Sequence, residues 1–323
     1  MYRMPLLLAL VAGPGLLATT ACADSQSPDA GSIEERRLSP ALANPRVVRW
    51  TDDHVVWVQV PARATQLMLL LPGTNGQPDN GSSVGRIAAE QGYRVIGLMY
   101  ADDVAVVTAC VSDPSPLCME NVRAEIIQGS DRSSHVSVDR DNSIDGRLAD
   151  LLRYLDQRFP GEDWDQFLDS NGEPRWNRIA VGGLSQGGGH AAFIGKLRQV
   201  VRVVMFGAPA DGYNGQVAPW MQVGATPANR YFGFRHARDP FTSIEPNWMA
   251  LGLQSLGPVT SVDGRSDSSF GESHMLITDA MPATGTFEHA HPSVFADGAT
   301  PRRGDGSFLF EAVWRYLLGT GRE

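Results

Sequence analysis

The chain contains 323 residues, of which 42% are hydrophobic and 20% are charged. This length and composition are sufficient to bury a core as one large domain or two small ones. The net charge is −9 and no run of basic residues offsets it, which argues against a nucleic-acid partner.

The N-terminal segment has the features of a secretory signal peptide. Arg3 precedes an apolar run over residues 6–12, and a Gly-Pro-Gly segment then makes the run too short and broken for a membrane span. We expect a signal peptide over residues 1–23 and an exported protein, periplasmic or secreted. Two processing routes remain open, namely cleavage before Asp24, or acylation of Cys22 and anchoring in the membrane.

The remaining cysteines agree with an oxidising compartment. Once Cys22 is removed or acylated, Cys110 and Cys118 form an even, closely spaced pair, which predicts a disulfide. A zinc site would need further ligands, and no histidine follows Cys118 at the spacing of a zinc finger. We therefore expect no metal.

Along the chain, a flexible lead over residues 24–44, rich in Ser, Pro, Asp, Gly and Glu, precedes alternating strands and helices. Residues 47–50 and 54–60 predict an antiparallel hairpin. Residues 66–71 are apolar at nearly every position, as a central strand of a parallel sheet requires. Residues 102–142 form a long excursion that we expect to wall or cover the site. Further strands are expected at 94–100, 178–184, 200–207, 230–236, 259–262 and 275–278, and helices at 85–91, 147–155, 245–256 and 308–318.

A candidate nucleophile lies between the strand at 178–184 and a helix of small residues. The segment reads Gly183-Leu184-Ser185-Gln186-Gly187. A serine at the apex of so tight a turn is lifted clear of the sheet, and the N-terminus of the following helix faces charge that develops there. The competing interpretation is a glycine-rich structural turn.

A second loop supplies candidate donors for an oxyanion hole. The strand at 66–71 ends in Pro72-Gly73-Thr74-Asn75-Gly76. In a doubly wound sheet this loop would lie beside Ser185, because ligands collect at the carboxyl ends of the strands. The backbone N–H of Thr74 or Asn75, together with that of Gln186, would then bind the oxyanion. A plain glycine turn is the alternative.

Candidates for the acid and the base follow the serine along the chain. Asp239 lies just beyond the strand at 230–236, and Asp211 is the alternative acid one strand earlier. His291, in the loop before the last helix, is the preferred base, and His274 is the alternative. Each of these residues could instead be an ordinary strand-end aspartate or a structural histidine.

These residues resemble the α/β-hydrolase superfamily, on the elbow at 183–187, the loop at 71–75 and Asp239 after its strand. More narrowly, the elbow and residues 231–234 and 313–318 look like a bacterial group of exported hydrolases. The resemblance implies an α/β domain over residues 45–323, with a mostly parallel central sheet and helices on both faces. It also implies ester hydrolysis through a Ser-His-Asp triad and an acyl-enzyme, on a small-molecule ester and without a cofactor.

Two classes of function remain open at this point. The first is an exported carboxylesterase, with a peptidase, an amidase or an acyltransferase as variants that differ only in their substrate pockets. The second is a binding or surface protein that keeps the fold without turnover. Activation of Ser185 distinguishes the two classes.

Overall fold

The computed structural model describes residue 1, residues 31–61 and residues 63–321. Cys22 and all but the first residue of the predicted signal peptide lie outside the described residues. Residues Gly31–Glu323 form one compact unit, and the description below concerns that unit. None of the helices within the described ranges is long and apolar enough to cross a membrane.

A nine-stranded sheet forms the centre of this unit. Its two antiparallel pairs are β1 with β2 and β2 with β4, and all other neighbours are parallel. In spatial order the strands are β1 (Ser32–Leu38), β2 (His54–Val60), β4 (Arg94–Gly97), β3 (Leu67–Leu71), β5 (Ile179–Leu184), β6 (Val203–Phe206), β9 (Tyr231–His236), β11 (Met275–Thr278) and β10 (Thr260–Ser261). A separate two-stranded sheet pairs β7 (Gly212–Tyr213) with β8 (Gln216–Val217).

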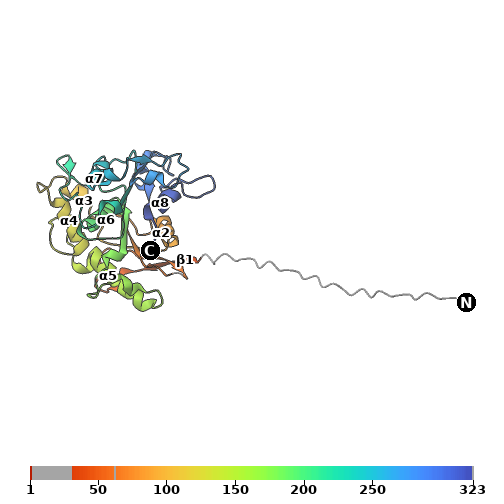
Figure 1. Ribbon diagram of the computed structural model, residues 1–323. Coiled ribbons are helices and arrows are strands. Elements are labelled where there is room, and N and C mark those ends of the chain that lie inside the picture. Colours follow the sequence, from red (N-terminus) through yellow and green to blue (C-terminus); the bar gives the residue numbers. More distant parts are fainter. Residues whose placement is uncertain (2–30, 62, 322–323) are drawn as a thin grey trace. The chain divides into compact units, whose positions relative to one another are not determined.

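Helices cover both faces of the sheet, as Figure 1 shows. On β3, Leu67, Leu69 and Leu71 pack into one core and Met68 and Leu70 into the other, because successive side chains of a strand point to opposite faces. The helices are α2 (Ser82–Glu90) and α8 (Glu311–Leu318) on one face, and α4 (Cys118–Gln128), α5 (Ile144–Arg158) and α6 (Gln186–Leu197) on the other. Shorter helices are α1 (Pro40–Ala43), α3 (Val106–Cys110) and α7 (Ile244–Ala250). The predicted α/β class, with a mostly parallel central sheet and helices on both faces, is confirmed.

The N-terminal part of the unit departs from the expectations. Residues 32–38, predicted as flexible, form the edge strand β1 and pair with β2 from Ser32 opposite Val60 to Leu38 opposite His54. Residues 47–50 are not a strand, so the partner of β2 in the hairpin is β1 instead. The composition of β1 has no apolar pattern from which a strand could be predicted. Its charged side chains stabilise the edge of the sheet through ion pairs, such as Arg36 with Glu162 at 2.7 Å, rather than through apolar burial.

The direction of the strands decides which loops meet. The carboxyl ends of β3, β5 and β9 lie along the same edge of the sheet, and they lead into Thr74, Ser185 and Asp239 respectively. His274 directly precedes β11, which is parallel to β9, so this histidine lies at the opposite edge. The fold therefore separates the two candidate bases.

Candidate active site

The backbone at Ser185 has the geometry of a nucleophile elbow. Ser185 caps the N-terminus of α6 with φ 55° and ψ −118°, a region that non-glycine residues rarely adopt. A β-carbon at Gly183 or Gly187 would collide with the backbone carbonyl oxygen of Leu71 on the neighbouring strand. The turn therefore requires both glycines, and it fits this tightly only against β3.

Asp239 and His291 form a hydrogen-bonded pair on the same edge of the sheet. The distance from His291 Nδ1 to Asp239 Oδ2 is 2.7 Å, and the other carboxylate oxygen accepts the backbone N–H of Phe241 at 2.9 Å. The carboxylate is fully buried, whereas the imidazole is 18% exposed. With an ionised carboxylate as acceptor, Nδ1 carries the proton and Nε2 presents a lone pair.

His291 and Ser185 line the same cavity. Nε2 of His291 is buried and has no hydrogen-bond partner among the described residues. Gly207, with φ 55°, leaves room for the ring, because a β-carbon there would lie 3.0 Å from His291 Cε1. The cavity has a volume of about 270 Å³. The residues that line it are Thr74, Ala105, Val106, Val107, Thr108, Arg123, Ser185, Gln186, Ala210, Asp211, Phe241 and His291.

The loop after β3 offers one of its two predicted donors. The backbone N–H of Asn75 donates to the carbonyl oxygen of Asp102 at 3.1 Å, so it does not point into the cavity and the expectation for Asn75 needs correction. The N–H groups of Thr74 and Gln186 donate to no other group among the described residues. The hydroxyl of Thr74 donates to Gln186 Oε1 at 2.9 Å, which ties the two loops together. This arrangement leaves Thr74 and Gln186 as the candidate pair.

Asp102 holds the loop after β3, a role that no sequence pattern had predicted. Its backbone oxygen accepts the N–H of Asn75, and its carboxylate accepts the N–H of Gly76 at 2.9 Å. Burial raises the pKa of the Asp102 carboxyl to about 7. The sequence signal that could have found it is an acidic residue two positions after the aromatic end of a buried strand, which is a weak one.

Asp211 pairs with an arginine rather than with a histidine. Its carboxylate accepts hydrogen bonds from Arg123 at 2.7 and 2.5 Å and from the indole of Trp220 at 2.9 Å. Arg123 also lies 3.3 Å from the carbonyl oxygen of Gln186 and 3.4 Å from His190 Nδ1. Burial, with a smaller contribution from Arg123, lowers the pKa of His190 well below its usual value, so this ring is neutral.

His274 has the contacts of a structural histidine. Its Nδ1 lies 2.7 Å from the carbonyl oxygen of Tyr231, and its ring stacks on Phe232 with the centroids 4.0 Å apart. Burial lowers its pKa. The structure thus brings Ser185, Asp239 and His291 to one edge of the sheet and leaves His274 at the other.

The excursion over residues 102–142 forms a wall of the cavity through α3. Cys110, at the end of α3, and Cys118, at the start of α4, form a disulfide with their Cα atoms 5.7 Å apart. A nitrogen of His135 lies within 4.8 Å of both sulfur atoms, a spacing that a metal site could have. The two sulfurs are bonded to each other, however, and His135 Nε2 lies 2.6 Å from Asp113. The predicted disulfide is confirmed in the structure.

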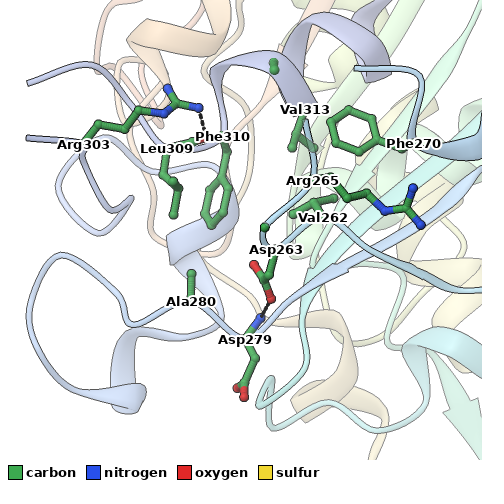
Figure 2. Close-up of a pocket in the computed structure, with 12 residues that line it drawn as sticks. Val262, Asp263, Arg265, Phe270, Asp279, Ala280, Arg303, Leu309, Phe310 and Val313 are labelled. Carbon is green, nitrogen blue, oxygen red and sulfur yellow. Dashed lines mark hydrogen bonds between the residues drawn. The ribbon is translucent and has the colours of Figure 1, made fainter. Parts of the chain in front are cut away.

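A larger cavity, of about 500 Å³, lies away from Ser185 between the segment after β10 and the start of α8 (Figure 2). Apolar side chains such as Phe270 and Phe310 line much of it. Asp263 accepts the N–H of Asp279 at 2.7 Å, and Arg303 donates to the carbonyl oxygen of Leu309 at 2.8 Å. Both of these polar contacts are within the cavity lining, and none of the described residues in that lining is a serine, a cysteine or a histidine.

Comparisons with known proteins yield weak similarities. No protein-family model and no curated protein matches the sequence. An esterase from Pyrobaculum calidifontis is similar with a TM-score of 0.25 at 14% identity, and the match covers 50% of this chain and 38% of that one. A protein from Klebsiella pneumoniae assigned as a dienelactone hydrolase is similar with a TM-score of 0.39 at 12% identity, covering 89% and 97%. The strand order of the sheet defines the fold.

Proposed function

We propose that the chain is a serine hydrolase that cleaves carboxylic esters, with Ser185 as nucleophile, His291 as base and Asp239 as the orienting acid. One observation carries the proposal. A strained serine at the start of α6 shares a cavity with an imidazole whose Nδ1 pairs with a buried carboxylate and whose Nε2 is unpartnered. Sequence alone left two histidines and two aspartates for these roles.

In the first half of the reaction, Ser185 Oγ attacks the ester carbonyl and His291 Nε2 takes its proton. The negative charge that develops on the carbonyl oxygen is stabilised by the N–H groups of Thr74 and Gln186 and by the N-terminus of α6. The imidazolium, held by Asp239, then protonates the leaving alcohol oxygen. The alcohol departs and the acyl group remains on Ser185.

In the second half, water attacks the acyl-enzyme. His291 Nε2 accepts a proton from the water, and the carboxylic acid leaves as the proton returns to Ser185. No cofactor takes part in these reaction steps. A peptidase, an amidase or an acyltransferase would use the same groups, so the substrate pocket separates these variants from an esterase.

A binding protein without turnover is the second candidate, and the backbone at Ser185 argues against it. A conformation of this kind costs about 1–3 kcal/mol and persists where the surrounding structure enforces it. A surface protein gains nothing from that cost, whereas a nucleophile gains exposure of its Oγ above the helix N-terminus.

The decisive test is labelling with a fluorophosphonate probe, which reacts with activated serines, followed by turnover of nitrophenyl butyrate. We expect wild-type protein to label and turn over. Ser185→Ala should abolish labelling, and His291→Ala should reduce kcat by about 10³-fold or more. His289→Ala is the matched control, because His289 is exposed and lies only two residues from His291.

The outcomes separate the two classes of function. Loss of labelling in Ser185→Ala, with the His289→Ala control active, supports the proposed roles. A folded wild-type protein that neither labels nor hydrolyses any ester would overturn the enzyme proposal in favour of a binding protein.

We also propose that the chain is exported, as a periplasmic or secreted protein. The apolar N-terminal segment and the disulfide between Cys110 and Cys118 support this location. Expression of the full chain, cell fractionation and intact-mass measurement test it. A mature chain that starts at Asp24 indicates cleavage, and a membrane-bound chain that Cys22→Ser releases indicates a lipid anchor. A cytosolic chain of full mass would contradict export.

A further inference from the structure

The cavity at Ser185 is small, and a buried ion pair between Arg123 and Asp211 forms part of its lining, which bears on the substrate. Resting on the proposed function, we propose that it accepts acyl chains of two to about six carbons, and that the Arg123–Asp211 ion pair forms its closed end.

The position of His291 assigns the two halves. The leaving oxygen must lie against His291 Nε2 to receive its proton, and Phe241 packs on the His291 ring with the centroids 5.0 Å apart, so this side takes the alcohol. The other half surrounds Gln186. The N–H of Val106 donates to Gln186 Oε1 at 3.1 Å, and Arg123 donates to its carbonyl oxygen at 3.3 Å. The acyl chain therefore extends between α3 and Arg123.

The volume limits the length of the chain. A cavity of about 270 Å³ holds roughly nine groups of the size of a water molecule, each taking about 30 Å³. The carbonyl carbon, the two ester oxygens and the first carbon of the alcohol occupy about four of these places. About five remain for the rest of the acyl chain. The walls beside them are apolar, with Val106, Val107 and Ala210.

The Arg123–Asp211 ion pair cannot move aside to admit a longer acyl chain. The Arg123 side chain is 3% exposed, and that of Asp211 is fully buried. The carboxylate also accepts the indole N–H of Trp220, and the backbone oxygen of Asp211 accepts the amide of Asn247 at 2.9 Å. Displacing either partner would leave an unpaired buried charge, which is costlier than the burial of a few methylene groups can offset.

The side wall is also held in place. Val106 and Val107 lie on α3, whose last residue, Cys110, is bonded to Cys118 at the start of α4. Arg123 lies on the same α4, so the disulfide ties the helix of the side wall to the helix that carries Arg123. Changing the size of a wall residue should therefore change the accepted length without moving the reacting groups.

The test is a series of nitrophenyl esters with acyl chains of two, four, six, eight and twelve carbons, measured as kcat/KM. We expect wild type to prefer chains of up to about six carbons and to be at least about tenfold slower on eight. Val107→Ala should move the optimum about two carbons longer, and Ala210→Leu should move it toward acetate. Val111→Ala, at an exposed valine just past α3, is the matched control and should leave the optimum unchanged.

The outcomes separate this inference from the proposed function. Fluorophosphonate labelling of each variant reports whether the fold and the nucleophile are intact. Labelled wild type that hydrolyses the eight-carbon ester as fast as the four-carbon ester would overturn the length limit, as would an identical optimum in Val107→Ala and Ala210→Leu. Absence of labelling and of turnover on every ester would overturn the proposed function and the inference together.

Discussion

At the scale of single residues, Ser185 combines a half-buried side chain at the cavity with an unfavourable backbone conformation. Its φ of 55° and ψ of −118° are open to glycine at little cost, whereas a residue with a β-carbon is strained there. The contacts that hold it are those of Gly183 and Gly187 with β3, so the strain is imposed by the sheet. Stability and reactivity therefore oppose each other at this position.

A glycine at this position should stabilise the protein. We expect Ser185→Gly to have a free energy of unfolding about 1 kcal/mol above that of Ser185→Ala, because alanine keeps the strain and glycine relieves it. Urea denaturation of the two inactive variants measures the difference. Equal stabilities would indicate that the turn is unstrained.

The two candidate acids should respond differently to the same change. We expect Asp239→Asn to lower kcat by about 10³–10⁴-fold with little loss of stability, because the amide no longer enforces the productive tautomer of His291. Asp211→Asn should lower the free energy of unfolding by about 3 kcal/mol, because it leaves Arg123 buried without its counter-charge. Ester kinetics and urea denaturation of both variants check this, and the opposite pattern would make Asp211 the orienting acid.

At the scale of elements, the loop after β3, residues 72–76, is held by Asp102, which lies outside it. Asp102 follows β4 and receives two successive N–H groups of the loop after β3, those of Asn75 and Gly76. The neighbouring N–H of Thr74 donates to no group among the described residues. The loop is therefore positioned by a residue that takes no part in the chemistry.

Asp102 should make stability depend on pH. Burial raises its pKa to about 7 from 3.8, so between about pH 4 and pH 7 the folded protein keeps a proton that the unfolded chain has lost. Its contribution to the free energy of unfolding therefore falls as the pH rises through this window. An asparagine at position 102 does not titrate. We therefore expect the free energy of unfolding of Asp102→Asn, relative to that of wild type, to rise by about 1–4 kcal/mol between pH 4 and pH 7.5. Urea denaturation at both pH values tests this, and a pH-independent difference would contradict it.

The disulfide joins α3 to α4 and should stabilise both the fold and the cavity wall. We expect the double variant Cys110→Ser and Cys118→Ser to lose about 2–3 kcal/mol of unfolding free energy, because the unfolded chain is no longer constrained by the closed loop. KM for short esters should rise, since α3 lines the cavity. Wild type treated with a reductant should behave in the same way. An unchanged free energy of unfolding would contradict the expected stabilisation by the disulfide.

At the scale of the whole molecule, strand direction separates His274 from His291. We expect His274→Ala to retain ester hydrolysis within a fewfold of wild type and to lose about 1–3 kcal/mol of stability, because it removes the stacking on Phe232 and the hydrogen bond to Tyr231. Kinetics and thermal unfolding together measure this. Loss of fluorophosphonate labelling in a folded His274→Ala protein would contradict the assignment of His291.

Features that rest on short-range patterns could be predicted from the sequence. The apolar run over residues 66–71 and the strand before Ser185 predicted central strands, because parallel strands are buried on both faces. The elbow was recognisable because its glycines and serine act within five residues. Strand β1 was not predicted, because an edge strand that is stabilised by ion pairs has no apolar pattern.

The sequence by itself determined the kinds of element, the candidate nucleophile and a short set of acids and histidines. Only the tertiary structure showed which members of that set lie together, since Asp239 and His291 are 52 residues apart in the chain and 2.7 Å apart in space. It also paired Asp211 with Arg123 and directed the N–H of Asn75 to the carbonyl oxygen of Asp102. The physical reason is that spacing along the chain sets local backbone geometry, whereas the direction and order of the strands set which distant side chains meet.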